Sequence, residues 1–279
     1  MAMKHLRLIV LVFALFWPAL TSAAPRADLW ERWIPLESDP SASVDHSAWN
    51  GFLARFVIQG GDGLNRFDYG AVRPQDRADL QRYLADLSAI RPTVLNRPEA
   101  MAYWINLYNA LTVDVVLDHY PVDSIRDIDI SPGFFSSGPW GAKLFEVEGV
   151  ALSLDDIEHR ILRPIWQTPL IHYAVNCASI GCPNLRAEAF EAARLAQQLD
   201  DAARTFVNHP RAVRVSGRVA EVSSIYDWFR SDFGSTDREV IDHLIRFAES
   251  PLAAQLRRVE RIGGDFYDWR LNDTASPGG

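Results

Sequence analysis

The most reactive side chains of the sequence gather in one short segment. Both cysteines, Cys177 and Cys182, stand there five positions apart, and His172 precedes them. A thiolate next to an imidazole base is the chemistry of thiol-dependent hydrolases and acyl transferases. In an extended strand, however, His172 and Asn176 share one face whereas Cys177 points to the other. A His172–Cys177 pair therefore requires a turn near Asn176, which the Ser-, Gly- and Pro-rich residues that follow permit.

The spacing of the two cysteines is compatible with four chemical states. In an oxidising compartment they most simply form a disulfide that closes a small loop. Alternatively, Cys177 is a nucleophile activated by His172 or His159, or a redox thiol that Cys182 resolves. A zinc site would use both histidines and both cysteines, although the tighter C-x₂-C signature is missing. The fourth alternative is a pair of inert buried thiols. We expect no metal and no cofactor.

A carboxylate and an imidazole stand in the helix expected after Ser153. Its apolar positions place Glu158 inside the inward-facing stripe, four residues after Leu154 and three before Ile161, with His159 on the flank. A carboxylate in such a stripe needs a cation or several donors, otherwise it takes up a proton. Perturbed carboxylates are enriched at active sites, but structural ion pairs give the same pattern. Both interpretations stay open for Glu158, and His159 alone is typical of a surface or orienting group.

Two amides lie in the most apolar helix of the sequence, expected from about Pro98 to His119. Asn106 and Asn109 are three residues apart and therefore share one face. Because a buried amide without partners costs about 1–3 kcal/mol, both must be hydrogen-bonded. They either line a site or hold nearby loops in place.

The elements that must position these residues are mostly helices. Helical spacing predicts further helices at 45–58, 75–89, 187–208, 224–232 and 237–248. Alternation predicts a strand and turn at 144–150 and a hairpin over 213–222, and the apolar run 170–175 predicts a buried strand. The strands are few and lack regular crossovers. The sequence therefore predicts an α+β fold, a helix-rich single domain around a central buried helix with a small, mainly antiparallel sheet.

The first 23 residues have the layout of a cleavable signal peptide. Lys4 and Arg7 precede an apolar run from Leu8 to Leu20, and small residues follow as a cleavage site. The run is shorter than the roughly 20 residues of a membrane-spanning helix. We therefore expect residues 24–279 to be one soluble globular domain, periplasmic or secreted, without a membrane span after cleavage.

Charge argues against some partners of the exported domain. Cleavage of residues 1–23 would remove two basic and no acidic side chains, which moves the net charge from −8 to −10. Nucleic acids and anionic lipids select basic surfaces, so neither is expected as a partner. The identity of a substrate or partner does not follow from composition.

Four ordered motifs of the sequence resemble the domain-of-unknown-function family 547. They are Trp104–Leu111, Ile157–His159 with Leu162-Arg163, His172–Cys177 with Pro183, and Tyr267–Trp269 with Leu271-Asn272. The similarity spans about 60–272, and bacterial members of the family resemble this chain in being exported. The resemblance carries over no activity. It implies that Cys177 occupies a family cysteine position, whereas the position of Cys182 is often serine in plant members, which favours a role for Cys177 without a disulfide.

Two functions follow as hypotheses. The first is an exported thiol-dependent hydrolase or acyl transferase, with Cys177 as nucleophile, His172 or His159 as base and Glu158 as orienting carboxylate. The amides of Asn106 or Asn109 would then stabilise the transition state. The alternative is a non-catalytic binding domain stapled by a Cys177–Cys182 disulfide, in which both amides and Glu158 hold loops in place and the loop 131–141 contacts a partner.

Overall fold

The computed structural model describes residues 25–39, 41–133 and 137–275 as a helix-rich α+β fold. The prediction of the fold class is confirmed. The predicted signal peptide at 1–23 lies outside the described residues, as do residues 134–136 of the loop predicted to contact a partner. None of the helices in the described ranges is long and apolar enough to cross a membrane.

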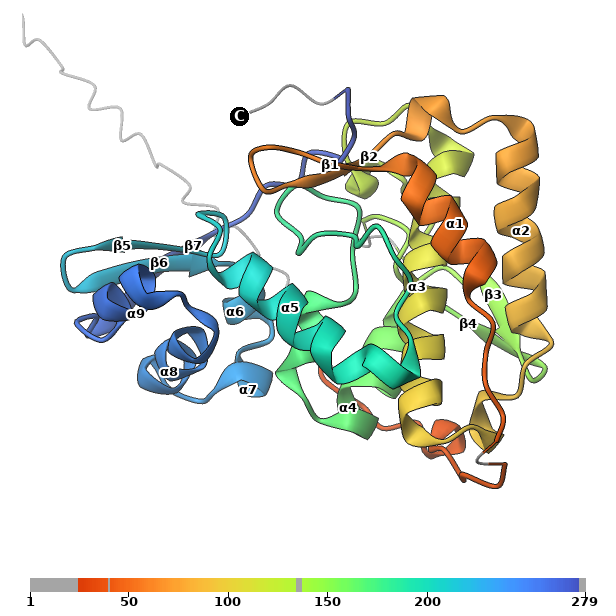
Figure 1. Cartoon of the computed structure of the whole chain (residues 1–279), viewed down its shortest axis with the longest axis horizontal. Helices are drawn as coiled ribbons and strands as arrows, with labels where there is room; N and C mark the ends of the chain where they lie inside the picture. The colour runs from red at the N-terminus through yellow and green to blue at the C-terminus, as the bar shows by residue number, and fades with distance from the viewer. Residues whose placement is uncertain (1–24, 40, 134–136, 276–279) are drawn as a thin grey trace, which may run out of the picture.

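Helix α3, Arg97–His119, lies at the centre of the larger part of the molecule (Figure 1). It begins where the Asn96 side chain accepts a hydrogen bond from the Glu99 N–H, with Pro98 in its first turn. All residues from Ala100 to Val113 are buried. Helices α1, Ser47–Phe56, and α2, Pro74–Ser88, pack on each other, and α2 packs on α3. The central buried helix is therefore present as expected.

Two hydrophobic clusters share helix α5, Leu195–Val207. Its first half contributes Leu195 and Leu199 to the cluster around α3. Its second half contributes Phe206 and Val207 to a smaller cluster, which also contains buried residues of α8, Asp237–Phe247. One continuous helix thus connects the two cores.

Within the described ranges, the strands form three small sheets, mainly antiparallel. The first two are hairpins, made of β1 (Val57–Gln59) with β2 (Asn65–Phe67) and of β3 (Phe145–Val147) with β4 (Val150–Leu152). In the third, β5 (Val213–Ser216) pairs antiparallel with β6 (Val219–Ser223), as predicted, and β6 pairs parallel with β7 (Arg261–Phe266). The remaining helices are α4 (Arg163–Trp166), α6 (Ile225–Trp228), α7 (Arg230–Phe233) and α9 (Ser250–Leu256).

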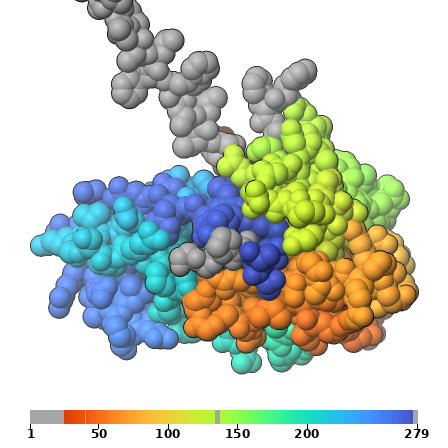
Figure 2. Space-filling view, turned by 90° about the horizontal axis from the view of Figure 1, so that it is seen from above, coloured from red at the N-terminus to blue at the C-terminus, as the bar shows by residue number. Residues whose placement is uncertain are grey.

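The chain after β7 returns to the larger part of the molecule and joins segments that are far apart in sequence. The Leu271 N–H donates to the Asp123 carbonyl, and the Phe67 N–H donates to the Asn272 carbonyl. In Figure 2 this dark-blue segment lies between the orange N-terminal elements and the yellow-green region around residues 120–133. The C-terminal segment therefore connects strand β2 with the segment that follows α3.

Three expected elements take other forms or other bounds. The predicted strand 170–175 is wrong, because Pro169–Tyr173 form a 3₁₀ helix with Thr168 capping the Leu170 N–H. A short buried apolar run has the same pattern in a strand and in a helical segment, so periodicity could not distinguish them. The helix expected after Ser153 is a π-helix over Asp156–Leu162. The helix expected from residue 187 begins only at Leu195, as α5.

Candidate functional site

The two cysteines form a disulfide, Cys177–Cys182. The thiol that the hydrolase hypothesis required at Cys177 is therefore not free, and the prediction of a nucleophilic Cys177 is wrong. The same bond removes the two sulfur ligands of the zinc alternative. Within the described ranges, no group of three or more His, Cys, Asp or Glu side chains is arranged to hold a metal ion.

Hydroxyl groups lie close to both sulfur atoms of the disulfide. The Tyr267 hydroxyl lies 3.2 Å from the Cys177 Sγ, 3.1 Å from the Cys182 Sγ and 2.9 Å from the Ser179 Oγ. The Cys177 N–H points at the Cys182 Sγ over 3.0 Å. Burial raises the pKa of Tyr267 well above its ordinary value, so its hydroxyl is protonated at neutral pH.

The loop closed by the disulfide is tied to the C-terminal segment. The Ile180 N–H donates to the Arg270 carbonyl over 2.9 Å, and the Gly181 N–H donates to the Asp268 carbonyl over 2.8 Å. A Cβ on Gly181 would come within 2.8 Å of the Asp268 nitrogen, which explains why a glycine stands there. The disulfide loop and the C-terminal segment therefore form one close-packed wall.

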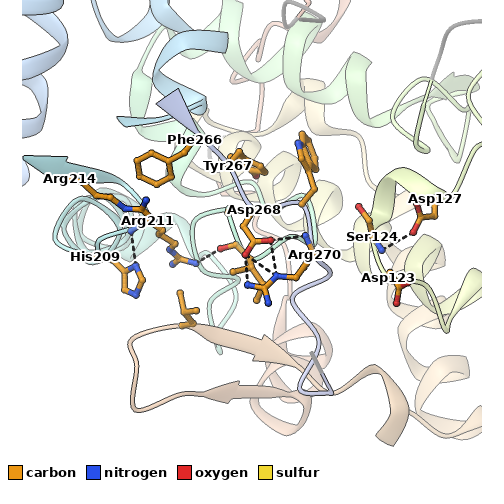
Figure 3. A pocket seen from close by; sticks show the side chains of 14 residues that line it. Asp123, Ser124, Asp127, His209, Arg211, Arg214, Phe266, Tyr267, Asp268 and Arg270 are labelled. Carbon is orange, nitrogen blue, oxygen red and sulfur yellow. Dashed lines mark hydrogen bonds and ion pairs between the residues drawn. The ribbon is translucent and has the colours of Figure 1, made fainter. Parts of the chain in front are cut away.

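An open pocket of about 730 Å³ lies against this wall (Figure 3). Ile180 and Gly181 of the disulfide loop line it together with residues of the C-terminal segment from Phe266 to Arg270. Leu64 of the β1–β2 turn and the segments that hold Arg211 and Asp123 complete its boundary. Pockets of this size are typical of small-molecule sites.

The charges of this pocket are separated. Figure 3 shows Arg211 and Arg214 at one end and Asp123 and Asp127 at the other. His209, beside Arg211, is neutral, because burial lowers its pKa and its Nδ1 accepts the Arg211 N–H. One end is thus positive and the other negative.

Among the described residues, Arg211 forms no ion pair with a carboxylate. Its Nη1 donates to the Ile180 carbonyl over 3.0 Å and its Nη2 donates to the Asn184 Oδ1 over 2.6 Å. Its Nε is buried and has no hydrogen-bond partner in the described part of the chain. Burial lowers the pKa of Arg211 to about 10, so the guanidinium keeps its charge at neutral pH. A partly desolvated cation of this kind gains free energy from an added anion.

Glu158, His159 and His172 come together in a separate buried cluster. The Glu158 Oε1 lies 3.7 Å from the His172 Nδ1 and 4.0 Å from the His159 Nδ1, and the Tyr108 hydroxyl donates to Glu158 Oε2 over 3.0 Å. The π-helix places Glu158 and His159 there, and π-helical turns are frequent at functional sites. The prediction that these residues are catalytic stays a prediction.

Asp232 of α7 completes the cluster. It accepts hydrogen bonds from the His172 Nε2 over 2.8 Å and from the Arg163 Nε over 2.6 Å. The His172 ring stacks on Phe229 with centroids 4.1 Å apart. The imidazole is therefore held by a carboxylate and an aromatic ring, and its Nδ1 has no hydrogen-bond partner among the described residues.

Burial sets the protonation of this cluster. It raises the pKa of Glu158 to about 7, lowers that of His159 to about 3 and also lowers that of His172. The hydrogen bonds from His172 and Arg163 hold the pKa of Asp232 well below its ordinary value, against the effect of burial. At neutral pH the charged members are thus Arg163 and Asp232, with Glu158 close to its midpoint.

Asn106 and Asn109 both bind backbone groups. Asn106 exchanges two hydrogen bonds with Phe190, one with its carbonyl and one with its N–H. Asn109 donates to the Ala174 carbonyl and accepts from the Asn176 N–H. These contacts correspond to the loop-holding alternative, and a ligand-binding role for either amide stays a prediction.

Arg211, Asp232 and the pocket itself were missed by reasoning from the sequence. Asp232 lies in α7 and Arg211 lies between α5 and β5. The hydrophobic periodicity of these elements predicts their secondary structure but does not indicate a functional role for either residue. Tyr267 and Asp268 were noticed only as part of a family motif, because contacts across more than 80 residues bring Tyr267 to the disulfide.

Comparison with known proteins identifies one segment. Residues 92–207 match the model of a family described as "Protein of unknown function, DUF547". The matched segment runs from just before α3 to the end of α5 and includes Glu158, His172 and both cysteines. Arg211 and the C-terminal wall of the pocket lie beyond it. Neither the curated proteins nor the solved structures include a match to this chain.

Proposed function

We propose that this protein is an exported, non-catalytic binding domain that holds an organic anion in the pocket against the disulfide loop. The observation that carries the proposal is Arg211, a partly buried guanidinium whose hydrogen bonds in the described part of the chain go to a carbonyl and an amide oxygen. Arg211 lines a pocket with aromatic residues in its wall, and no ion pair with a described carboxylate holds its charge. A carboxylate on a ligand would supply the missing counter-charge.

The disulfide supports binding rather than thiol chemistry. It closes the loop whose Ile180 carbonyl orients Arg211 and whose backbone N–H groups bind the C-terminal segment. A bond between residues five positions apart also limits the conformations of this loop before the ligand arrives. Such preorganisation lowers the entropic cost of binding. The bond is consistent with an oxidising compartment, in which the signal peptide predicted at 1–23 would place the protein.

Binding of a simple organic anion tests the proposal. We expect N-acetylphenylalanine, which carries one carboxylate and one aromatic ring, to bind and to change the tryptophan fluorescence through Trp269. Its amide, which lacks the charge, should bind at least about tenfold more weakly, because a hydrogen-bonded charge contributes about 1.5–3 kcal/mol. Calorimetric titration of both compounds measures the difference.

Two variants separate binding from folding. Arg211→Ala should abolish the preference for the acid over the amide, and Arg214→Ala, on an exposed position of β5, should reduce it without disturbing the loop. The control variant is Arg257→Ala, which removes an exposed arginine that does not line the pocket. This variant should bind both compounds as tightly as the native protein does. Equal affinity of the native protein for acid and amide would contradict the proposal.

A further inference from the structure

We propose that the ligand is dipolar, a short peptide-like chain whose carboxylate lies against Arg211 and Arg214 and whose amine lies against Asp123 and Asp127. The inference rests on the proposed function and adds to it a second charge and an orientation. The observation behind it is the separation of unlike charges at the two ends of one pocket (Figure 3).

The two ends belong to different parts of the chain that the fold holds at a fixed separation. Arg214 lies in β5, and Arg211 follows α5. The acidic end lies beyond α3, where Asp127 accepts a hydrogen bond from the Ser124 N–H. The C-terminal segment connects the ends, because its Leu271 N–H donates to the Asp123 carbonyl over 2.7 Å.

The wall between the ends carries little net charge. Asp268 and Arg270 form an ion pair with each other, 2.6 Å between Oδ2 and Nη2. The rings of Tyr267 and Trp269, which are tilted to each other with centroids 4.7 Å apart, also line the pocket. This arrangement suits a ligand whose charges stand at its ends and whose middle is neutral.

The two ends should contribute unequally to affinity. Arg211 is partly buried, and its Nε has no hydrogen-bond partner among the residues that the structure describes, so loss of the ligand carboxylate should weaken binding at least about tenfold. Asp123 and Asp127 are exposed, and the Arg126 guanidinium lies nearby, 5.2 Å from the centre of the Trp269 ring. Loss of the ligand amine should therefore weaken binding only about two- to fivefold, and less at high salt.

Three related tripeptides test the orientation. Gly-Gly-Phe carries both charges, N-acetyl-Gly-Gly-Phe only the carboxylate, and Gly-Gly-Phe amide only the amine. Calorimetric titration of the full chain at low ionic strength should rank them in this order of affinity. Asp123→Asn should remove the advantage of Gly-Gly-Phe over its acetylated form, whereas Asp201→Asn, an exposed position on α5, should leave it unchanged.

The outcomes distinguish this inference from the function on which it rests. If the acetylated peptide binds as tightly as Gly-Gly-Phe, the pocket accepts an anion and the dipolar ligand is refuted. An advantage that persists in Asp123→Asn and in Asp127→Asn would also refute it. If neither peptide with a carboxylate binds better than the amide, the proposed function itself fails.

Discussion

Glu158 is a carboxyl group in a position that disfavours its charge. Only 7% of the residue is exposed, one oxygen accepts from the Tyr108 hydroxyl, and the nearest imidazoles are largely neutral. Burial therefore raises its pKa to about 7. A group whose pKa rises on folding stabilises the folded state while it is protonated. For Glu158 this contribution is complete below pH 4.5 and is lost as the pH rises through 7.

Replacement of Glu158 by glutamine reveals how much its protonation contributes to the free energy of unfolding. We expect the free energy of unfolding of the native protein, relative to Glu158→Gln, to fall by at most about 3 kcal/mol between pH 5 and pH 8, since each pKa unit corresponds to about 1.4 kcal/mol. Urea unfolding at several pH values measures the difference. Glu146→Gln, an exposed position on β3, should run parallel to the native protein. Parallel curves for Glu158→Gln as well would show that Glu158 does not titrate in this range.

The π-helix is supported by hydrogen bonds from the N-terminal segment that packs beside it. The N–H groups of Asp28 and Trp30 donate to the carbonyls of His159 and Arg160, each over 3.0 Å. The Trp30 ring also lies 4.1 Å from the Arg160 guanidinium. The extended N-terminal segment therefore supplies donors to a helix that carries two residues of the buried cluster, and it contributes to the position of Glu158.

A proline at residue 28 tests this support. Asp28→Pro removes the N–H that binds His159, whereas Asp28→Ala keeps that N–H and removes only the ion pair with Arg160. We expect the proline variant to be about 1 kcal/mol less stable than the alanine variant, the net value of one hydrogen bond. Thermal unfolding compares the two. Equal stability would mean that the segment does not stabilise the π-helix.

At the scale of the molecule, the two hydrophobic clusters are joined by buried polar contacts as well as by α5. Arg163 and His172, beside the larger cluster, both bind Asp232 of α7. Loss of either cluster would leave these groups without partners, which is costly in a buried site. The single domain predicted from the sequence is therefore a physically reasonable proposal despite the two cores.

Calorimetry tests this cooperativity. We expect one unfolding transition whose calorimetric and van't Hoff enthalpies agree. The variant Asp232→Asn weakens the connection between the clusters and should lower the transition temperature or broaden the transition. Arg257→Ala should have no such effect, because Arg257, directly after α9, is exposed. Two separate transitions in the native protein would show that the cores unfold independently.

Patterns within a few residues determined most of the elements. The apolar run that begins at Pro98 specified α3, and alternation around Gly217 specified the β5–β6 hairpin, because helix and hairpin formation depend on neighbours along the chain. The stripe that contains Glu158 likewise predicted a buried carboxylate. The spacing of the cysteines left the disulfide open as one of four alternatives.

Only the tertiary structure decided which distant residues meet. The Tyr267 hydroxyl reaches the disulfide, Asp232 reaches His172, and Arg211 and Asp123 come to lie at opposite ends of one pocket. None of these contacts has a local signature, because each joins segments tens of residues apart whose approach depends on packing around α3 and α5. The sequence thus determined the elements and the chemically unusual residues. Packing decided that the cysteines stabilise a pocket wall instead of providing a nucleophile.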